Sequence, residues 1–402
     1  MKVLQINATY ATGSTGVIVQ DISEYSTIAN IQSYVAYPKG HGNAKDNFYE
    51  IGSILDHKLH AILCRIAGKQ GYFSYWSTKR LIDYIAKISP DIVHLHNIHS
   101  NYINTNMLFA YLAKKNIATV ITLHDCWFFT GGCFHYTTTG CQKWKHLCGN
   151  CPRRMEDFPA LLYDASREIL EDRVKYLSAI PNLTLVGCSK WIAGELAQSR
   201  LKDVARITYI HNGIDLDIFK PRQSNLKKRL NIEDKFVILG PATKWLSAIN
   251  KGTLDYFVAN LPNDTVLLLF GVNGSDEVQS TNVIYYGYTQ NREELAELYS
   301  AADVMVNCSH EDTLSTINLE AQACGTPVVT YDATGNKETV DGKCGWAIES
   351  GNFHTLFIKT MNIKKMGKAL FSSSCLKFIT EHFEKGCSYN NYIKLYQQLH
   401  SV

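Results

Sequence analysis

Residues 309–329 read SHEDTLSTINLEAQACGTPVV and follow a short apolar run at Val304–Cys308. This order predicts a buried strand, a polar loop, a helix, a Gly-Thr-Pro turn and then a second strand. The free backbone amides at the N-terminus of such a helix, together with the helix dipole, favour a bound phosphate. The second half of the chain is therefore predicted to hold an anion at the carboxyl end of a strand.

Two acids bracket this predicted phosphate site. Asp312 lies in the polar loop, and Glu320 follows in the helix. Glu320 is placed to accept hydrogen bonds from both hydroxyls of a ribose, and Asp312 to accept them from the group that the phosphate carries. An acid on each side of a phosphate fits a ligand with a sugar on each side of a diphosphate.

Short apolar runs alternate with helical segments along the chain, which predicts parallel sheets with crossover helices. The pattern begins again after the turn sequence Asn-Gly-Ile-Asp at 212–215. The same architecture twice predicts two Rossmann-like α/β domains that face each other across a cleft, with ligands at the carboxyl ends of the strands. The predicted strands are Val3–Asn7, Val35–Pro38 (weaker), Asp91–Asn97, Ala118–Asp125, Leu183–Ser189, Ile207–His211, Phe236–Ala242, Thr265–Gly271, Val283–Gly287, Val304–Cys308 and Pro327–Tyr331.

The predicted domains are residues 1–215 and residues 216–385. Residues 386–402 follow as a terminal helix. Its apolar face is expected to pack on the core, because these side chains recur at helical spacing: Tyr389, Tyr392, Ile393, Tyr396 and Leu399.

Composition bounds the class of protein. The 402 residues are 46% hydrophobic and 19% charged, which excludes a disordered chain. The net charge of +3 is too small for a nucleic-acid binder. No apolar run reaches the roughly 18–20 residues that span a bilayer, and the N-terminus lacks the pattern of a signal peptide. We expect a cytoplasmic protein with no nucleic-acid partner.

Glycines and lysines supply further candidates for an anion site. Gly13 and Gly16 lie in the loop after the first strand, where they let a backbone approach a ligand. Lys244 and Lys251 follow the first strand of the second domain, where an ammonium can neutralise a diphosphate. Taken alone, the loop also fits an ordinary turn, and Lys251-Gly252 also fits a solvated helix start.

Histidines stand at the ends of two predicted strands of the first domain. His96 and His99 follow one strand, and His124 with Asp125 follows another. A carboxylate beside an imidazole can orient or charge it, so His124 is the strongest catalytic candidate. Each histidine alone also fits a buried structural imidazole. Further candidates for contact with a ligand at these strand ends are His96, His99, Asp125 and Trp127.

Cysteines cluster directly after His124, within residues 126–151. The spacing Cys133-x7-Cys141-x6-Cys148-x2-Cys151 brings four thiols within reach of one tetrahedral zinc ion. Disulfides and free buried thiols are the alternatives. Four thiolates leave no open position on the ion, so the predicted zinc is structural and no cofactor is expected for catalysis.

Together these motifs resemble glycosyltransferase family 4, the retaining enzymes of the GT-B fold, over essentially the whole chain. The resemblance rests on the glycine loop, the His-Asp pair, Asn-Gly-Ile-Asp at 212–215, Lys-Gly and, most specifically, Glu-Ala-x-Ala-Cys-Gly-Thr-Pro-Val-Val from Glu320. The family pattern is Glu-x7-Glu, whereas this chain has Asp312 at the first acid, with Glu311 beside it. The cysteine cluster resembles one in a polysaccharide-assembling branch of the family.

The resemblance implies that residues 1–215 form the acceptor-side domain, with His96, His99, Asp125 and Trp127 as acceptor-side candidates, and that residues 216–385 bind the nucleotide sugar. It also implies roles for single residues. Glu320 would hold the nucleotide ribose, and the loop with Gly13 and Gly16 would approach the diphosphate. His124 would contact the donor sugar, and Asp312 or Glu311 would meet the transferred sugar. Lys251 would compensate the leaving group, but the partner Arg falls at or next to Trp245, where Lys244 is the substitute. The implied catalytic residues are His124, Asp312 and Lys251, and the loop residues implied in donor binding are Glu311, Asp312, Thr313, Leu314, Ser315 and Thr316.

The implied function is transfer of a hexose-type sugar from a nucleoside diphosphate, with UDP favoured over GDP, in surface-polysaccharide (O-antigen or capsule) synthesis. The implied acceptor is a glycan or a lipid-linked oligosaccharide. The resemblance further implies retention, by front-side displacement in which the leaving phosphate takes the acceptor's proton. The alternatives are a sugar-nucleotide epimerase on the same fold and a zinc-knuckle binding protein.

A basic and apolar segment between His57 and Pro90 suggests a membrane partner. Six Lys or Arg residues occur there against one acid, Asp83, with large apolar residues between them. This pattern predicts a patch that rests on anionic headgroups at the inner face of the cell membrane. An ordinary amphipathic surface helix is the alternative. The basic residues are Lys58, Arg65, Lys69, Lys79, Arg80 and Lys87.

Overall fold

The computed structural model describes residues 1–40, 47–157, 159–272 and 281–401, which form two compact units. The first unit comprises residues 1–212 and 388–402, and the second comprises residues 213–387. The C-terminal segment thus belongs to the first unit rather than forming a separate part. In the part of the chain that the structure describes, no helix is long and apolar enough to cross a membrane.

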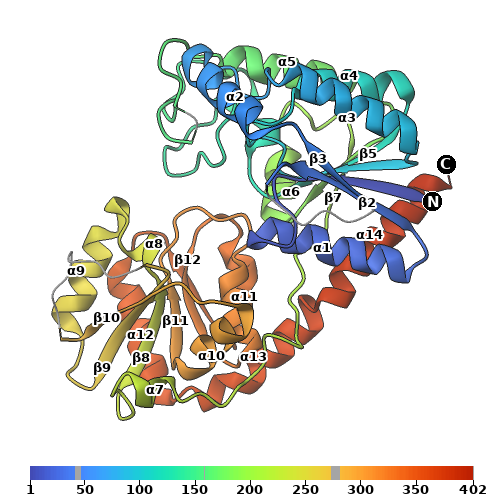
Figure 1. The fold of residues 1–402 in the computed structure, drawn as a ribbon. Helices are drawn as coiled ribbons and strands as arrows, with labels where there is room; N and C mark the ends of the chain where they lie inside the picture. The colour runs from blue at the N-terminus through green and yellow to red at the C-terminus, as the bar shows by residue number, and fades with distance from the viewer. Residues whose placement is uncertain (41–46, 158, 273–280, 402) are drawn as a thin grey trace. The chain divides into compact units, whose positions relative to one another are not determined.

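A seven-stranded sheet forms the centre of the first unit, with the strand order β3-β2-β1-β4-β5-β6-β7. Its strand pairs are parallel, and helices lie on both of its faces (Figure 1). The strands are β1 Lys2–Ile6, β2 Gln32–Pro38, β3 Phe48–Ile51, β4 Ile92–Leu95, β5 Ala118–Leu123, β6 Leu183–Gly187 and β7 Arg206–Tyr209. The helices are α1 Gly13–Ile28, α2 Ile54–Ala67, α3 Tyr75–Ile88, α4 Thr105–Lys115, α5 Ser166–Ser178 and α6 Lys190–Leu196, with 3-10 turns at Trp127–Phe129 and Lys143–Lys145.

The second unit repeats this architecture around a six-stranded parallel sheet, with the order β10-β9-β8-β11-β12-β13. The strands are β8 Phe236–Pro241, β9 Thr265–Phe270, β10 Val283–Tyr286, β11 Val304–Asn307, β12 Val328–Asp332 and β13 Gly345–Glu349. The helices are α7 Leu226–Arg229, α8 Ala242–Trp245, α9 Lys251–Asn260, α10 Arg292–Ala301, α11 Thr316–Ala323, α12 Phe353–Met366 and α13 Ala369–His382, with 3-10 turns at Ala248–Asn250 and Thr334–Thr339.

These two strand orders confirm the predicted α/β fold with two Rossmann-like halves. In each sheet the order reverses between the first and fourth strands, which are β1 and β4 in one unit and β8 and β11 in the other. Ligands of such sheets bind outside the carboxyl ends of the strands at this switch point. The predicted strands correspond to observed ones, but the sequence analysis missed β3 and β13, which are short edge strands.

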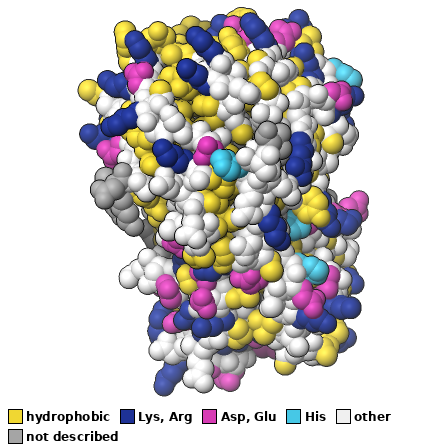
Figure 2. Space-filling model, turned by 90° about the vertical axis from the view of Figure 1, so that its right-hand side faces the viewer, with side chains coloured by type: hydrophobic (Ala, Val, Ile, Leu, Met, Phe, Trp, Pro, Cys, Tyr) yellow, Lys and Arg dark blue, Asp and Glu magenta, His cyan; other side chains and the backbone are white. Residues whose placement is uncertain are grey.

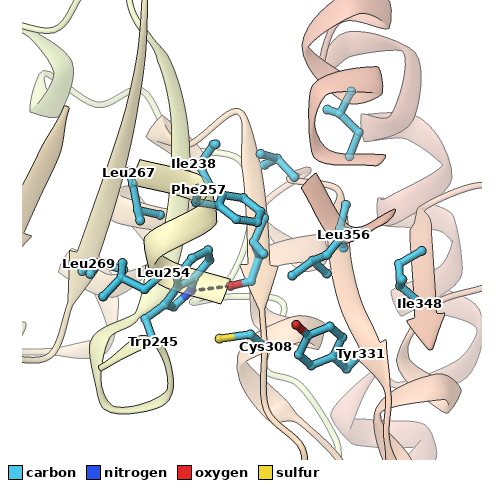
Figure 3. Packing of buried hydrophobic residues seen from close by; sticks show 14 of the residues in the cluster. Ile238, Trp245, Leu254, Phe257, Leu267, Leu269, Cys308, Tyr331, Ile348 and Leu356 are labelled. Atoms are coloured by element: carbon cyan, nitrogen blue, oxygen red, sulfur yellow. Dashed lines mark hydrogen bonds between the residues drawn. The ribbon is translucent and has the colours of Figure 1, made fainter. Parts of the chain in front are cut away.

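The core of the second unit is a continuous layer of aliphatic and aromatic side chains between the sheet and its helices. Figure 3 shows Trp245 of α8 pointing into this layer, beside Leu254 and Phe257 of α9. The Trp245 indole Nε1 donates to the carbonyl of Val306 at 3.1 Å, which satisfies its polar group inside the core. α8 is thereby fixed to β11, beside the switch point.

Helix α14 (Lys385–His400) packs on the first unit through the apolar face that its spacing predicts. Two of its tyrosines also make buried hydrogen bonds to the sheet: Tyr396 to His94 at 2.6 Å and Tyr392 to Thr122 at 3.0 Å. Both chain ends lie beside Asp91, which contacts the Lys2 backbone and His400 (Figure 1). The C-terminal helix is therefore an integral part of the first unit.

Candidate functional site

The loop after β11 ends at a helix N-terminus that no side chain caps. Ser315 occupies the N-cap position of α11, yet its hydroxyl accepts from Asn307 Nδ2 at 3.0 Å and makes no capping bond. The first-turn amides of α11 are left for another acceptor, which a phosphate oxygen can supply. The side chains of Thr313, Leu314 and Ser315 are buried, so these residues can meet a ligand chiefly through their backbone.

Buried amides and a close glycine contact fix the shape of this loop. Asn307 binds Ser315 and also Asn318, at 3.0 Å in each case. On the other side, Thr334 accepts from the Asp312 amide at 2.8 Å, and a side chain at Gly335 would collide with the Thr313 carbonyl. The loop is therefore held in one conformation without a ligand, as an electrostatic site requires.

The acids of the loop differ in their surroundings. Asp312 is half-buried, and its Oδ1 accepts from the Leu314 amide at 3.3 Å, so one carboxylate oxygen braces the loop itself. Glu311, beside it, is also half-buried. Asp312 is thus held by the loop that leads into α11.

Glu320 lies in α11 and is the most perturbed carboxyl of the site. Tyr299 donates its hydroxyl to Glu320 Oε2 at 3.1 Å. Burial raises the pKa of Glu320 from 4.5 to about 7, although the Tyr299 hydroxyl and the nearby charge of Arg292 act in the opposite direction. Glu320 is half-buried, and its carboxylate, poorly stabilised by its surroundings, accepts hydrogen bonds strongly, as binding of a ribose diol requires.

The two lysines occupy different positions beside this loop. Lys244 of α8 is half-buried, and its charge reaches the thiol of Cys308 at the end of β11. Lys251 is exposed and begins α9. Trp245, where the family's Arg is expected, is fully buried in the core, so it cannot meet a phosphate.

A buried hydrogen-bond bridge spans the turn between the two lysines. Asn250 donates to the carbonyls of Lys244 at 3.0 Å and Cys308 at 2.9 Å, and its Oδ1 contacts His310 Nε2 at 3.0 Å. The turn after β8 and the loop after β11 are therefore held together at the switch point of this sheet.

In the first unit, the loop after β1 leads into another uncapped helix. Thr12 is the N-cap residue of α1 and makes no side-chain capping bond. Gly13 has φ +65° and is exposed, which suits close approach of a ligand. Gly16 is buried, and a Cβ there would lie 2.8 Å from Thr9 Oγ1, so the absence of a side chain makes room for Thr9. The approach of Gly16 to a ligand stays a prediction.

A chain of buried hydrogen bonds determines which nitrogen of His124 carries a proton. Gln5 Nε2 must donate to the Val19 carbonyl at 3.1 Å, so Gln5 Oε1 accepts from His96 Nε2 at 3.2 Å. His96 Nδ1 then accepts from His124 Nε2 at 3.1 Å. His124 is thus the Nε2–H tautomer, and its Nδ1 is the acceptor atom.

Both imidazoles of this chain are neutral near pH 7. Burial lowers the pKa of His124 to about 4. The charge of Asp125 acts to raise this pKa, and the charge of His99 acts to lower it further. Burial, with His94 and His124 nearby, also holds the pKa of His96 well below 6.5. His124 therefore acts as an uncharged hydrogen-bonding group.

The acceptor-side candidates differ in burial. His96, His99 and Trp127 are buried, whereas Asp125 is half-buried, and contact of these four residues with an acceptor stays a prediction. His99 Nε2 and Asp125 Oδ2 form a pair at 2.9 Å. Asp125 is half-buried and also accepts from the Trp127 amide at 2.8 Å, so it stays at the surface end of β5.

Gln70 and Arg173 hold the segment after β5 in place through contacts with Trp127 and its neighbours. Gln70 donates to the His99 carbonyl at 2.6 Å and accepts from the Trp127 indole. The Arg173 guanidinium lies 3.6 Å from the centre of the Trp127 ring and donates to the Thr130 carbonyl at 2.6 Å. Burial lowers the pKa of Arg173 to about 10. This value is still well above 7, so the guanidinium stays charged.

The four cysteines of the predicted zinc site line one small cavity together with Trp144. All twelve cysteines are free thiols. In the described part of the chain, no group of three or more His, Cys, Asp or Glu side chains is placed to hold a metal ion. The residues thus do not fit a zinc ion as they stand, and zinc at Cys133, Cys141, Cys148 and Cys151 stays a prediction from sequence.

Several polar residues of both switch points were missed by the sequence analysis. Gln5 is an amide inside the apolar run of β1, a signal that could have marked it as a buried polar partner. Tyr299, Arg292 and Asn250 carry no local signal, since only the fold brings them to Glu320 and to the loop after β11.

Comparison with known proteins shows the family and the fold of both units. Residues 15–218 match the family model described as Glycosyltransferase Family 4, and residues 246–363 match that of Glycosyl transferases group 1. The putative colanic acid biosynthesis glycosyl transferase WcaC of Escherichia coli K12 is 22% identical, and the match covers 94% of each chain.

Solved structures share the whole fold at low sequence identity. Sucrose-phosphate synthase of Thermosynechococcus elongatus superimposes with a TM-score of 0.69 at 18% identity, covering 100% of this chain and 99% of the other. HepE of Anabaena, solved in complex with UDP, gives 0.65 at 15% identity, covering 99% and 100%. The Family 4 match spans half of the chain, and the second unit matches a glycosyl transferase model as well. The chain therefore belongs to Glycosyltransferase Family 4 and is a glycosyltransferase of the GT-B fold.

Proposed function

We propose that this enzyme transfers a hexose from a nucleoside diphosphate, UDP in preference to GDP, to a glycan or lipid-linked oligosaccharide. The proposed pathway is surface-polysaccharide synthesis at the cytoplasmic face of the cell membrane. WcaC, similar over 94% of its length, is named for colanic acid biosynthesis. HepE, similar in fold, was solved with UDP and with UDP-glucose.

The observation that carries the proposal is the pairing of Glu320 with the uncapped N-terminus of α11. Glu320 lies in the same short helix as the first-turn amides of α11. A diphosphate bound to these amides would therefore bring its ribose close to Glu320. The desolvated carboxylate of Glu320 can accept from both ribose hydroxyls. Phosphate and diol recognition in one strand–loop–helix unit fits a nucleoside diphosphate better than a simple anion.

Catalysis in this proposal is mainly stabilisation of charge on the departing diphosphate. Lys251, Lys244 and the α11 amides supply positive potential where that charge develops. The loop after β11 is already braced by Asn307 and Thr334, so little reorganisation is needed during the reaction. The carboxylates of Asp312 and Glu311 would accept hydroxyls of the transferred sugar.

Retention of the anomeric configuration is part of the proposal. The bond from the anomeric carbon to the diphosphate oxygen breaks, and the acceptor oxygen bonds to the same face of that carbon. The acceptor's proton passes to the departing phosphate oxygen, so no protein base is required. The neutral imidazole of His124 fits this scheme, since its role is to bind the sugar rather than to take a proton.

A nucleotide panel followed by product analysis tests the proposal. Thermal unfolding is measured with UDP, GDP, ADP and CMP and with their common sugar conjugates. A ligand at about 100 times its Kd should stabilise the protein by about 2.7 kcal/mol, or several degrees in Tm. We expect UDP and one UDP-hexose to give the largest shift, and proton NMR of the product to show the donor's anomeric configuration. The absence of a shift with every nucleotide, or an inverted product, would contradict the proposal.

A further inference from the structure

The imidazole of His310, in the loop after β11, joins segments at the carboxyl ends of four neighbouring strands. It contacts Asn250, in the segment after β8, at 3.0 Å, and Ser350, directly after β13, at 2.8 Å. Its ring also packs against that of Tyr331 in β12, with the ring centres 4.9 Å apart. Because β8, β11, β12 and β13 are adjacent in the sheet, this one side chain connects a continuous row of strand ends.

The hydrogen bonds of Asn250 determine which nitrogen of His310 carries a proton. Asn250 Nδ2 donates to the carbonyls of Lys244 and Cys308, at 3.0 Å and 2.9 Å. Its Oδ1 is therefore the atom that faces His310, and an amide oxygen only accepts. His310 Nε2 must carry a proton, and Nδ1 then accepts from the Ser350 hydroxyl.

Both ring nitrogens of His310 are thus engaged inside the protein. Burial lowers the pKa of His310 below its ordinary 6.5, although the charge of Glu311 acts to raise it, so the imidazole is mostly neutral at pH 7. A phosphate oxygen could accept from His310 Nε2 only in place of Asn250. His310 is therefore suited to hold neighbouring segments together rather than to touch a substrate.

Asn250 is the N-cap residue of α9 but makes no capping bond. Asn is among the residue types that most favour this position, because its side-chain oxygen can accept from a first-turn amide of the helix. Here that oxygen accepts from His310 instead, so the bridge takes the place of a helix cap. Lys251 follows directly as the first residue of α9, and the bridge fixes the backbone from which its side chain extends.

We propose that His310 is a positioning residue, which through Asn250 holds the start of α9, and with it Lys251, against the loop that leads into α11. The inference rests on the proposed function, in which Lys251 and the α11 amides stabilise charge on one departing diphosphate. Such groups act best when their geometry is set before the reaction, and a displacement of about 1 Å can cost about 100-fold in rate. The α11 loop is braced separately by Asn307 and Thr334, so His310 should affect the rate of transfer more than nucleotide affinity.

Steady-state kinetics and calorimetric titration of the full chain test the proposal. The ligands are the nucleoside diphosphate and the nucleotide sugar that give the largest thermal shifts in the panel. His310→Phe keeps a ring beside Tyr331 but removes both nitrogens. We expect its kcat to fall about tenfold, with the nucleotide Kd changed by less than about twofold. His310→Gln, whose amide can donate to Asn250 Oδ1, should recover kcat to within about threefold of the unaltered chain.

A double variant shows whether His310 acts through Lys251. Lys251→Ala/His310→Phe should be no slower than Lys251→Ala alone, because the lysine that His310 positions is already absent. Losses that multiply in the double variant would overturn the proposal. An unchanged kcat in His310→Phe, or an equal loss of kcat and of nucleotide affinity, would overturn it too.

His382→Phe is the matched control. Other histidines of the chain reach the surface, and Figure 2 shows some of them on one face, among charged and polar side chains. His382 of α13 is likewise exposed, so the control makes the same change outside the bridge. It should keep the kcat and the nucleotide Kd of the unaltered chain, and a loss equal to that of His310→Phe would contradict the positioning role.

Nitrogen-15 spectra of the unaltered chain test the bridge without any variant. They should show His310 as the Nε2–H tautomer, and a proton on Nδ1 alone would overturn the proposal. The two possible failures are distinguishable. An unaltered chain that neither binds nor turns over any nucleotide sugar would contradict the proposed function, and the positioning role with it. Multiplied losses with normal nucleotide affinity would contradict only the role of His310.

Discussion

The two switch points of this enzyme differ in the kind of polar groups that they contain. After β8 and β11, the second unit gathers formal charges and open dipoles: Lys244, Glu320 and the uncapped N-terminus of α11. After β1, β4 and β5, the first unit gathers the neutral imidazoles of His96 and His124 in one hydrogen-bond chain with Gln5.

The two units share one fold, but this difference suits them to two different tasks. Charged groups on a rigid loop suit a ligand whose charge grows during the reaction, as a departing diphosphate does. A neutral, half-buried imidazole with a fixed tautomer, such as that of His124, suits a sugar hydroxyl, which needs one acceptor with a set direction and no charge. The second unit is thus expected to control rate and nucleotide affinity, and the first unit sugar positioning.

Removing a lysine should have the largest effect if the second unit stabilises the leaving group. We expect Lys251→Ala to lower kcat by about 100-fold, because one preorganised charge in such a site contributes about that factor. Lys244→Ala should cost about tenfold. Lys377→Ala serves as the control, because Lys377 is exposed and paired on the surface with Glu381. Steady-state kinetics with the nucleotide sugar found in the panel measures all three variants.

A larger loss in Lys244→Ala than in Lys251→Ala would change this assignment. Lys244 is the lysine whose charge reaches the end of β11, whereas Lys251 is supported by the family pattern. The reversed ranking would give Lys244 the role of the missing Arg.

Truncating Glu320 should mainly weaken nucleotide binding. We expect Glu320→Ala to raise the Kd of the nucleoside diphosphate by about 30-fold, because two hydrogen bonds to a charged acceptor are lost. Calorimetric titration measures the change. Glu381→Gln on the surface of α13 is the control, and the Tm of Glu320→Ala checks that Tyr299, which donates to Glu320, tolerates the loss. An unchanged Kd would remove Glu320 from the binding site.

The sequence shows the common location of the second unit's candidate residues more directly than that of the first unit's. The loop, helix and acids around Asp312 and Glu320 are consecutive in sequence, so one motif predicts their common location. In the first unit, a strand-end position did not predict burial: His96 and Trp127 point into the interior, and Gly16 packs on Thr9. Burial depends on segments distant in sequence, such as α5 with Arg173, which no local pattern contains.

Breaking the imidazole chain should affect sugar positioning more modestly. We expect Gln5→Leu to lower kcat/KM by about tenfold, the cost of one misplaced hydrogen bond, with nucleotide Kd unchanged. The chain also predicts a direct signature. Nitrogen-15 spectra of the imidazoles should show His96 and His124 as Nε2–H tautomers, with mixed tautomers in Gln5→Leu.

Tyr396→Phe is the matched control for this chain. It removes a buried hydrogen bond to His94 but leaves the contacts among Gln5, His96 and His124 in place. An equal loss of activity in both variants would mean that general destabilisation, and not the tautomer of His124, causes the effect. A proton on His124 Nδ1 in the unaltered protein would contradict the chain outright.

The smallest expected effect is a pH dependence of nucleotide binding that belongs to the second unit alone. Burial holds the pKa of Glu320 at about 7 in the free protein, above its ordinary 4.5, so the protonated form is favoured by folding. The associated stabilisation is complete below pH 4.5 and is lost as pH rises through 7. A ribose diol binds the carboxylate, so nucleotide affinity should change in the opposite sense, rising about threefold from pH 6.5 to 7.5, with proton release on binding.

Titrations in buffers of different ionisation enthalpy measure both the nucleotide affinity and the proton release. Glu320→Gln should abolish the pH dependence, while His124→Gln should keep it, because the pKa of His124 lies near 4, outside this range. A pH dependence that survives in Glu320→Gln and disappears in His124→Gln would place the titrating group in the first unit and reverse the division of tasks between the two switch points.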